Sequence, residues 1–292
     1  MLTRRNFFPL ALSPLFGLCA IPHARARDRA EIDAALAAIE TQSGGRLGVA
    51  VLDTTSGALA GHRTGERFPM CSTFKVLAAA ATLARVDAGH EQLTRRVRIE
   101  ASELLSYAPI TKTHLQSEMS VAELCEAAIT LSDNTAANLL LKALGGPAGL
   151  TSYARTLGDD VTRLDRIEPD LNEATPGDPR DTTTPAAMAQ TLRKLATGDA
   201  LSATARDLLI AWMVGCKTGR AKLRAGLPDD WRVGDKTGAG EHGTSNDIAA
   251  IWPSGRTLLI VTAYLTETTA TEETRNAVHA GIGRIVARSI DG

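Results

Sequence analysis

A serine and a lysine stand three positions apart in the segment RFPMCSTFKVLAAA, where an apolar helical pattern begins. On a helix that starts near Ser72, the side chain of Lys75 lies on the same face, about 5–6 Å away at the β-carbons. A serine hydroxyl becomes a useful nucleophile when a base or a cation assists it, and a desolvated lysine can do so. The helix start also directs unpaired backbone N–H groups at charge developing near Ser72. The pair therefore predicts nucleophilic catalysis.

Cys71 precedes this serine and is a second possible nucleophile. The residue three positions after it is Phe74, so helical spacing gives the thiol no base and no cation. A cysteine beside an apolar run usually packs and does not react. We expect Ser72 to be the nucleophile and Cys71 to be a packing neighbour.

Further polar motifs follow along the chain. Ser-Asp-Asn at 132–134 separates two helical patterns, where it either exposes a hydroxyl and an amide or is an ordinary helix cap. Glu-Pro-Asp-Leu-Asn at 168–172 places a carboxylate and an amide in a long loop, either for chemistry or as solvated loop polarity. Lys-Thr-Gly at 236–238 closes a strand pattern and can present a cation and a hydroxyl along a strand edge. A second Lys-Thr-Gly, at 217–219, follows a helix and is interpreted as a turn.

The elements that position these motifs divide the chain into two ends and a middle. The N-terminal part reads as helix, strand, turn and strand, and the middle is almost wholly helical. From Trp231 onward three strand patterns precede a last helix. We therefore expect the two ends to form one antiparallel sheet and the middle to form a helical body. The expected ranges are a helix over 31–40, a strand over 46–53, helices between about 70 and 214, strands over 231–236, 244–252 and 256–265, and a helix over about 272–290.

One segment without either periodicity runs over about 163–181. A loop of this length in a compact domain is usually functional or disordered, and its charges and prolines do not decide between the two.

Composition is that of a soluble globular protein, with 44% hydrophobic and 22% charged residues. Without residues 1–26 the chain loses three arginines and no acid, which leaves 29 basic against 33 acidic residues and a net charge of −4. This balance argues against a nucleic-acid partner. Three cysteines remain, so at least one is unpaired in a monomer, and disulfides are not the expected source of stability.

The first 26 residues are typical of an export signal, with paired arginines, an apolar run and an Ala24-Arg25-Ala26 ending. The Thr-Arg-Arg-Asn-Phe opening favours the twin-arginine type. A membrane anchor is the alternative, but the run is shorter than the roughly 18–20 residues that span a bilayer. Lipid attachment at Cys19 is disfavoured because Leu18 precedes it. We expect cleavage near Ala26, a periplasmic protein, and no stable membrane association.

Taken together, Ser-x-x-Lys, Ser-Asp-Asn, Glu-x-x-x-Asn and Lys-Thr-Gly, in this order, resemble the class A serine β-lactamases, among the penicillin-recognising serine enzymes. The resemblance covers nearly the whole mature chain. It implies an α/β (α+β) two-domain fold, with a five-stranded antiparallel sheet flanked by the terminal helices and an all-helical domain. The implied divisions are a signal at 1–26, a sheet domain at 27–62 with 223–292, and a helical domain at 63–222.

The resemblance implies that Ser72 attacks the strained lactam carbonyl and forms an acyl-enzyme. The backbone N–H groups of Ser72 and Ala239 would form the oxyanion hole, which is typically worth about 2.7–4 kcal/mol per donor. Glu168 would activate the deacylating water and Asn172 would help to hold it. Whether Glu168 or Lys75 accepts the first proton remains open at this point.

Other positions correspond to substrate contacts in this family. Ser132 would pass a proton toward the leaving nitrogen, and Asn134 would bind the side-chain amide of the substrate. Lys236 and Thr237 would engage the substrate carboxylate, and Tyr107 would line the mouth of the site.

The resemblance also covers the neck of the long loop, and it fails at one substrate-binding arginine. Arg166 and Asp181 match the pair that pins the neck of the long loop, which would make the loop a rigid platform. Many relatives place an arginine after Lys-Thr-Gly, but the segment here supplies Ser245 and its neighbour asparagine. We expect Lys222 to contribute that charge; the alternative is a solvated lysine.

Some relatives form a disulfide at positions that correspond to Ala79 or Gly240 in this chain. We therefore expect no intramolecular disulfide from Cys71 or Cys125. For the substrate spectrum, Gly240 and Glu241 resemble narrower penicillinases, whereas Cys71 occurs also in broader relatives, so the range is left open.

Two alternatives share part of the motif set. A cell-wall D,D-peptidase lacks the water-activating glutamate, and a β-lactam sensor domain would belong to a membrane receptor. The chain shows no G-x-S-x-G, no H-E-x-x-H, no Walker loop and no histidine pair spaced for zinc. We expect a monomeric hydrolase of small-molecule β-lactams that uses no metal and no cofactor.

Overall fold

The computed structural model describes the backbone of residues 21–291 and the side chains of residues 30–289. The predicted export signal therefore lies outside the described residues, apart from the backbone at 21–26. Among the described residues, no helix is long and apolar enough to span a bilayer.

One five-stranded sheet forms the centre of the molecule, in the order β2-β1-β9-β8-β7 with antiparallel pairing throughout. The strands come from the two ends of the chain, as the sequence predicts. Their bounds are β1 (Arg46–Asp53), β2 (Leu59–His62), β7 (Arg232–Ala239), β8 (Ser245–Trp252) and β9 (Leu259–Thr266), with short strands β3 (Phe68–Pro69), β4 (Arg96–Arg98), β5 (Glu118–Ser120) and β6 (Thr182–Thr183) elsewhere.

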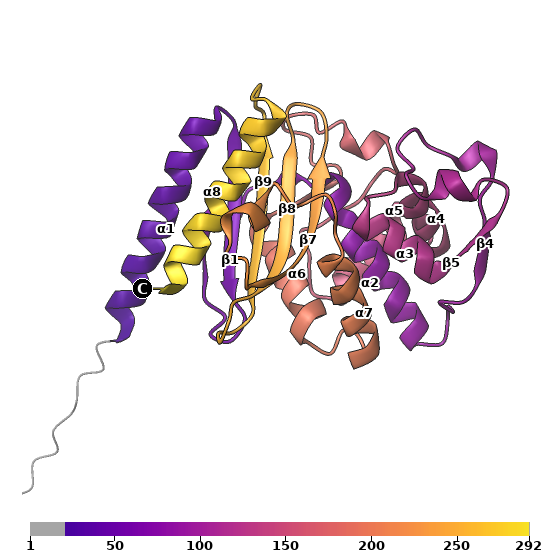
Figure 1. Ribbon diagram of the computed structural model, residues 1–292, viewed down its shortest axis with the longest axis horizontal. Coiled ribbons are helices and arrows are strands. Elements are labelled where there is room, and N and C mark those ends of the chain that lie inside the picture. Colours follow the sequence, from indigo (N-terminus) through magenta and orange to yellow (C-terminus); the bar gives the residue numbers. More distant parts are fainter. Residues whose placement is uncertain (1–20, 292) are drawn as a thin grey trace, which may run out of the picture.

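Helices cover both faces of this sheet, and Figure 1 shows the terminal pair on one side and the helical body on the other. The terminal helices α1 and α8 contact each other, while α6 contacts β1 and β9 and α7 contacts β7 on the opposite face. The helices are α1 (Ile21–Ser43), α2 (Phe74–Asp87), α3 (Val121–Thr130), α4 (Asn134–Leu144), α5 (Gly146–Thr156), α6 (Pro185–Thr197), α7 (Ala203–Val214) and α8 (Glu272–Asp291), with 3-10 turns η1 (Cys71–Thr73), η2 (Ala101–Glu103), η3 (Thr111–His114), η4 (Asp170–Asn172) and η5 (Leu223–Gly226).

The second half of strand β8 shows why apolar residues occupy both faces of the central strands. Ala249 and Ile251 pack in the core under α1 and α8, whereas Ile248 and Ala250 pack in the core of the helical body. Successive side chains of a strand point to opposite faces, so a strand covered on both faces has no polar alternation. The sheet thus separates two apolar cores.

Helix α2 is the buried axis of the helical body and contacts α3, α4, α5 and α7. Its residues from Phe74 to Leu83 are all buried. The predicted helix starts are confirmed: Ser120 and Glu123 form a reciprocal capping box on α3, and Thr184 caps α6 with its hydroxyl. The fold class predicted from the sequence is confirmed, while the residue boundaries of the two domains stay a prediction.

Three cysteines in the described part of the chain, Cys71, Cys125 and Cys216, are free and buried. The residues that the structure describes contain no cluster of histidine, cysteine and acidic side chains that could hold a metal ion.

Candidate active site

Ser72 lies in η1, the short turn that leads from β3 into α2. Its side chain is buried but lines a cavity, whereas Cys71 is fully buried and lies outside that cavity's lining. Cys71 also has a φ of 45°, a left-handed conformation that costs energy in a residue with a β-carbon. The surrounding structure holds this turn in place and presents the serine alone to the cavity.

Lys75 is fully buried one turn further along α2 and is surrounded by oxygen acceptors. Its Nζ donates to Ser72 Oγ at 2.8 Å, to the Ser132 carbonyl at 2.8 Å and to Asn134 Oδ1 at 2.6 Å. It also lies 2.9 Å from Glu168 Oε1. Burial lowers the pKa of Lys75, and the carboxylate of Glu168 opposes that shift. The sequence-predicted serine-lysine pair is therefore in direct contact.

Glu168 joins the same group from the long loop and is almost completely buried. Ser72 Oγ donates to Glu168 Oε1 at 3.2 Å, and Asn172 Nδ2 donates to Glu168 Oε2 at 2.5 Å. Asn138 holds the backbone of Glu168 on both sides, donating to its carbonyl at 2.9 Å and accepting from its N–H at 3.0 Å. Sequence reasoning missed Asn138, although it stands four residues after Asn134 on the same face of α4.

Arg166 and Asp181 meet at the neck of the long loop. Arg166 Nε donates to Asp181 Oδ2 at 2.6 Å. Oδ1 of Asp181 accepts from the backbone N–H groups of Asp165 at 2.7 Å and Arg166 at 2.9 Å. A buried carboxylate with this many donors ties the two ends of the loop together, so that Glu168 is carried on a fixed platform.

Strand β7 lies at the edge of the sheet and contacts η1. Lys236 and Thr237 are adjacent on it, so their side chains leave opposite faces of the strand. Lys236 Nζ donates to Ser132 Oγ at 3.0 Å and to the Thr237 carbonyl at 2.7 Å. Burial, with a smaller contribution from the nearby Lys75, lowers the pKa of Lys236 to about 8. The hydroxyl of Ser132 thus lies between two lysines, since Lys75 Nζ is 3.3 Å from it.

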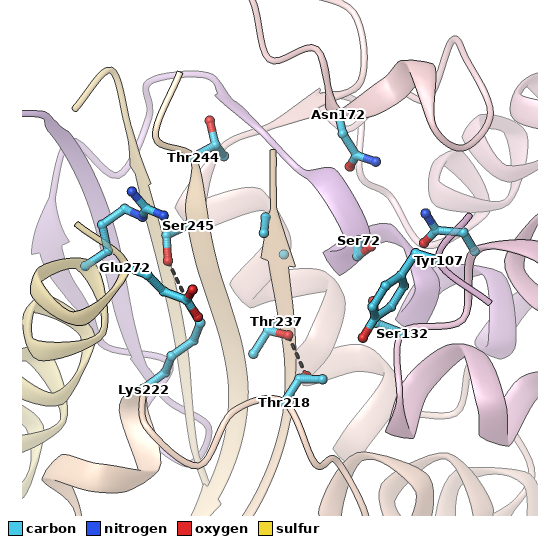
Figure 2. A pocket seen from close by; sticks show the side chains of 14 residues that line it. Ser72, Tyr107, Ser132, Asn172, Thr218, Lys222, Thr237, Thr244, Ser245 and Glu272 are labelled. Atoms are coloured by element: carbon cyan, nitrogen blue, oxygen red, sulfur yellow. Dashed lines mark hydrogen bonds between the residues drawn. The ribbon is translucent and has the colours of Figure 1, made fainter. Parts of the chain in front are cut away.

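On the other face of β7, Thr237 contacts the second Lys-Thr-Gly segment, at 217–219. Its Oγ1 lies 2.6 Å from Thr218 Oγ1 (Figure 2). Thr218 Oγ1 in turn lies 3.3 Å from Cys216 Sγ. The second Lys-Thr-Gly is indeed in a turn, but its threonine also lines the cavity. Folding brings this segment against the edge of β7, which a local turn pattern does not indicate.

Lys222 reaches the same end of the cavity and donates to Ser245 Oγ (Figure 2). Its side chain is partly buried, and this burial lowers the pKa of Lys222, against the opposing effect of Asp247. The alternative of a freely solvated lysine is therefore wrong.

Ser72, Thr237 and Lys222 line one open cavity of about 410 Å³, within the range of small-molecule sites. Ser72 and Ala239 both line it, as the predicted oxyanion pair requires, and Tyr107 is 49% exposed at its mouth. The sequence reasoning did not find Thr218, Thr244, Glu272 or Arg275, which belong to no catalytic motif. The lining comprises Ser72, Tyr107, Ser132, Asn134, Asn172, Thr218, Lys222, Thr237, Gly238, Ala239, Thr244, Ser245, Glu272 and Arg275.

A buried serine bonded to a lysine and a carboxylate, next to a cation for an anionic substrate, defines a serine acyl-transfer enzyme. Residues 31–290 match the β-lactamase enzyme family. The chain belongs to this family, and it is a class A serine β-lactamase.

Relatives and solved structures agree with that assignment. The chain is 52% identical to β-lactamase CTX-M-8 of Citrobacter amalonaticus over 88% of each chain. It is 48% identical to β-lactamase Toho-1 of Escherichia coli over 95% of this chain and 94% of that one. An ancestral class A β-lactamase superimposes with a TM-score of 0.88 at 63% identity, over 88% of this chain and 99% of that one. The putative class A β-lactamase PenP of Rhodopseudomonas palustris superimposes with a TM-score of 0.88 at 59% identity, over 89% of this chain and 99% of that one.

Proposed function

We propose that this β-lactamase hydrolyses penicillins and cephalosporins through an acyl-enzyme on Ser72. The observation that carries the proposal is the contact of Glu168 with both Ser72 and Asn172. A D,D-peptidase or a sensor domain needs only to be acylated. A carboxylate beside the nucleophile, with an amide next to it, supports the additional step in which water releases the acyl group.

Acylation begins when Ser72 Oγ attacks the lactam carbonyl carbon and its proton leaves for a base. The charge that develops on the carbonyl oxygen is stabilised by the backbone N–H groups of Ser72 and Ala239. The collapse of this intermediate breaks the carbon–nitrogen bond of the ring. The strain of the four-membered ring makes that bond the one that breaks.

Glu168 is the base that the contacts favour for the first proton. Five oxygens lie within 3.3 Å of Lys75 Nζ, and a protonated amine donates three hydrogens whereas a neutral amine donates two. The hydroxyl of Ser72, in turn, donates to Glu168. In this arrangement Lys75 is the ammonium that assists Ser72, and Glu168 receives the proton of the Ser72 hydroxyl.

The proton then reaches the leaving nitrogen through a short relay. Glu168 Oε1 lies 2.9 Å from Lys75 Nζ, which lies 3.3 Å from Ser132 Oγ. Ser132 protonates the nitrogen and is reprotonated by Lys75, which regains the proton held by Glu168. The relay returns Glu168 to its ionised form before water attacks.

Deacylation uses the same carboxylate. A water held by Glu168 and Asn172 attacks the ester carbon and gives its proton to Glu168. The ester carbon–oxygen bond breaks, and the proton returns to Ser72 Oγ. The product acid leaves and the enzyme is restored.

The remaining contacts orient the substrate. Oδ1 of Asn134 is occupied by Lys75, so its Nδ2 is the group available to the side-chain amide of the substrate. Lys236, Thr237 and Lys222 form the end that receives the substrate carboxylate, and Tyr107 covers the mouth. Lys222→Ala should therefore raise the KM for penicillins, and an unchanged KM would contradict its role.

The proposal is tested by mixing the purified protein with a chromogenic cephalosporin. Many turnovers per enzyme are expected, and a single stoichiometric burst would overturn hydrolysis in favour of capture. With penicillin, Glu168→Ala should accumulate the acyl-enzyme, seen by mass spectrometry as an adduct of one intact substrate mass. The absence of that adduct would remove Glu168 from its role in deacylation.

The export signal and the activity together support a place in the periplasm, where the enzyme would meet β-lactams before they reach the cell wall. There it would act as a monomer and confer antibiotic resistance. Expression with and without residues 1–26 tests this location, since only the full chain should raise the antibiotic concentration that the cells survive.

A further inference from the structure

Asp247 is a fully buried acid on β8, in the layer between the sheet and helix α8. Ser245 is two residues earlier on the same strand, so both side chains leave the same face. On the neighbouring strand, Asp247 stands directly opposite Thr237, which lines the active-site cavity. This face of the sheet edge therefore carries a buried carboxylate beneath the carboxylate-binding end of the site.

The contacts of Asp247 fix the chain next to Lys222. Its Oδ2 accepts the backbone N–H of Leu223, the residue that follows Lys222, at 3.1 Å. At the other end of the lysine, Nζ donates to Ser245 Oγ. Lys222 is consequently held by strand β8 at both its backbone and its amine.

Two acids, Asp235 and Asp247, are buried in this layer, and Arg224 forms its hydrogen bond with Asp235. Arg224 donates to the other buried acid, Asp235, and to the carbonyls of Met213 and Val214. His279, from α8, lies against Ser245, and burial with the charge of Lys222 lowers its pKa well below the usual range, so it adds no cation there. Burial and the neighbouring Asp235 raise the pKa of Asp247 while Lys222 opposes that shift, so the acid and the lysine favour each other's charged forms in this layer.

We propose that Asp247 is a positioning residue that holds Lys222 at the floor of the cavity and thereby determines the preference for substrates with a free carboxylate. The inference rests on the proposed function, because it assumes that Lys222 receives that carboxylate. It assigns to β8 a part in substrate selection, although Asp247 itself does not line the cavity.

Two substitutions separate the two contributions of this side chain. Asp247→Asn retains an oxygen that can accept the Leu223 N–H but cannot ionise, whereas Asp247→Ala removes both the oxygen and the ionisable group. The readout is the ratio of kcat/KM for a penicillin to kcat/KM for its methyl ester, which lacks the anionic group. Both substrates meet the same active enzyme, so partial unfolding of a variant cancels in this ratio.

The expected ratio falls by about tenfold in Lys222→Ala and by a similar factor in Asp247→Ala, with Asp247→Asn between the wild type and Asp247→Ala. The double variant should fall no further than Lys222→Ala, since both changes act through one cation. Asp159→Asn is the matched control, because Asp159 is a buried, hydrogen-bonded acid outside the cavity lining. Its ratio should equal that of the wild type.

A wild-type ratio in both Asp247 variants would overturn the inference, as would an additive double variant. If Asp247→Ala fails to fold, Asp247→Asn alone decides between these outcomes. A failure of the proposed function would look different: the wild-type enzyme would turn over neither the acid nor the ester, and the inference would fall with it.

Discussion

Cys71 and Ser72 are chain neighbours in opposite environments. The thiol is fully buried, and an added β-carbon at Gly240 would lie 2.7 Å from its Sγ. Burial raises the pKa of Cys71, so the thiolate that would react is disfavoured. The serine hydroxyl meets both Lys75 and Glu168. Reactivity at this turn is therefore decided by which side chain faces the cavity.

Substitution at the two positions should have very different effects. Ser72→Ala should lower kcat by at least about 10⁴-fold, because no other oxygen occupies the position of attack. Cys71→Ser should retain hydrolysis and cost about 1–3 kcal/mol of stability, since it buries a new hydroxyl. Steady-state kinetics and thermal unfolding check both, and an active Ser72→Ala with an inactive Cys71→Ser would overturn the mechanism.

The lowered pKa of Lys236 predicts a pH dependence of substrate binding. The lysine binds an anionic substrate while it is protonated, so kcat/KM for a penicillin should fall as the pH rises through about 8. The methyl ester should show no such fall. Lys236→Arg is the control, because a guanidinium stays charged to pH 12 and above. A flat profile for the acid up to about pH 9.5, well above that pKa, would contradict the assignment.

At the scale of elements, helix α4 and the long loop are joined through one side chain. Asn138 makes both of its hydrogen bonds to the backbone of Glu168. Arg166 and Asp181 close the loop at its neck, and Asn138 holds the backbone of Glu168 itself. A displacement of about 1 Å in a catalytic group can cost 10²-fold in rate.

Asn138→Ala should therefore slow deacylation by about 10²-fold and let the acyl-enzyme accumulate in stopped-flow experiments with penicillin. Ser202→Ala is a matched control, because it removes the cap of α7 and the bond of Ser202 to Asp87, away from the cavity. It should cost about 1 kcal/mol of stability without changing the rates. Equal kinetics in the two variants would show that Asn138 is merely structural.

At the scale of the whole molecule, Glu40 ties the terminal helix α1 to the sheet. It accepts from the Leu47 N–H at 2.9 Å and from Arg63 Nε at 2.7 Å, and it lies 3.0 Å from His62 Nε2. Burial raises the pKa of Glu40, but these hydrogen bonds outweigh burial and lower the pKa to about 2. A carboxylate with a depressed folded-state pKa stabilises the protein above its unfolded-state pKa, and this stability is lost as the pH falls.

Glu40→Gln should thus lower the free energy of unfolding by about 1–2 kcal/mol at pH 7. The loss should be much smaller near pH 2, where the native carboxylate is itself being protonated. Urea unfolding at both pH values measures this difference. Glu66→Gln is the control, because its ion pairs are 46% exposed at the glutamate and contribute little. A constant penalty for Glu40→Gln across this range would contradict the assignment.

Much of the architecture was predictable because the signals are local. A strand buried on both faces, such as β9, is rich in apolar and β-branched residues and shows no polar alternation. Helix caps such as Ser120 and Thr184 act within four residues of themselves. The division of strands between the two chain ends follows directly from these patterns. Asn138, Thr218 and Asp247 could not be assigned in this way, because their partners are distant in the chain.

The amino-acid sequence alone determined the order and spacing of the four catalytic motifs, and Ser72 with Lys75 could be paired because one helical turn brings them together. Only the tertiary structure decided that Ser132, Glu168 and Lys236, from a helix junction, a loop and an edge strand, meet at that pair. The physical reason is that contacts across a sheet or between helices depend on packing in three dimensions. Lys222 shows this most clearly: the sequence leaves a solvated lysine as the alternative, and in the fold strand β8 makes it part of the site.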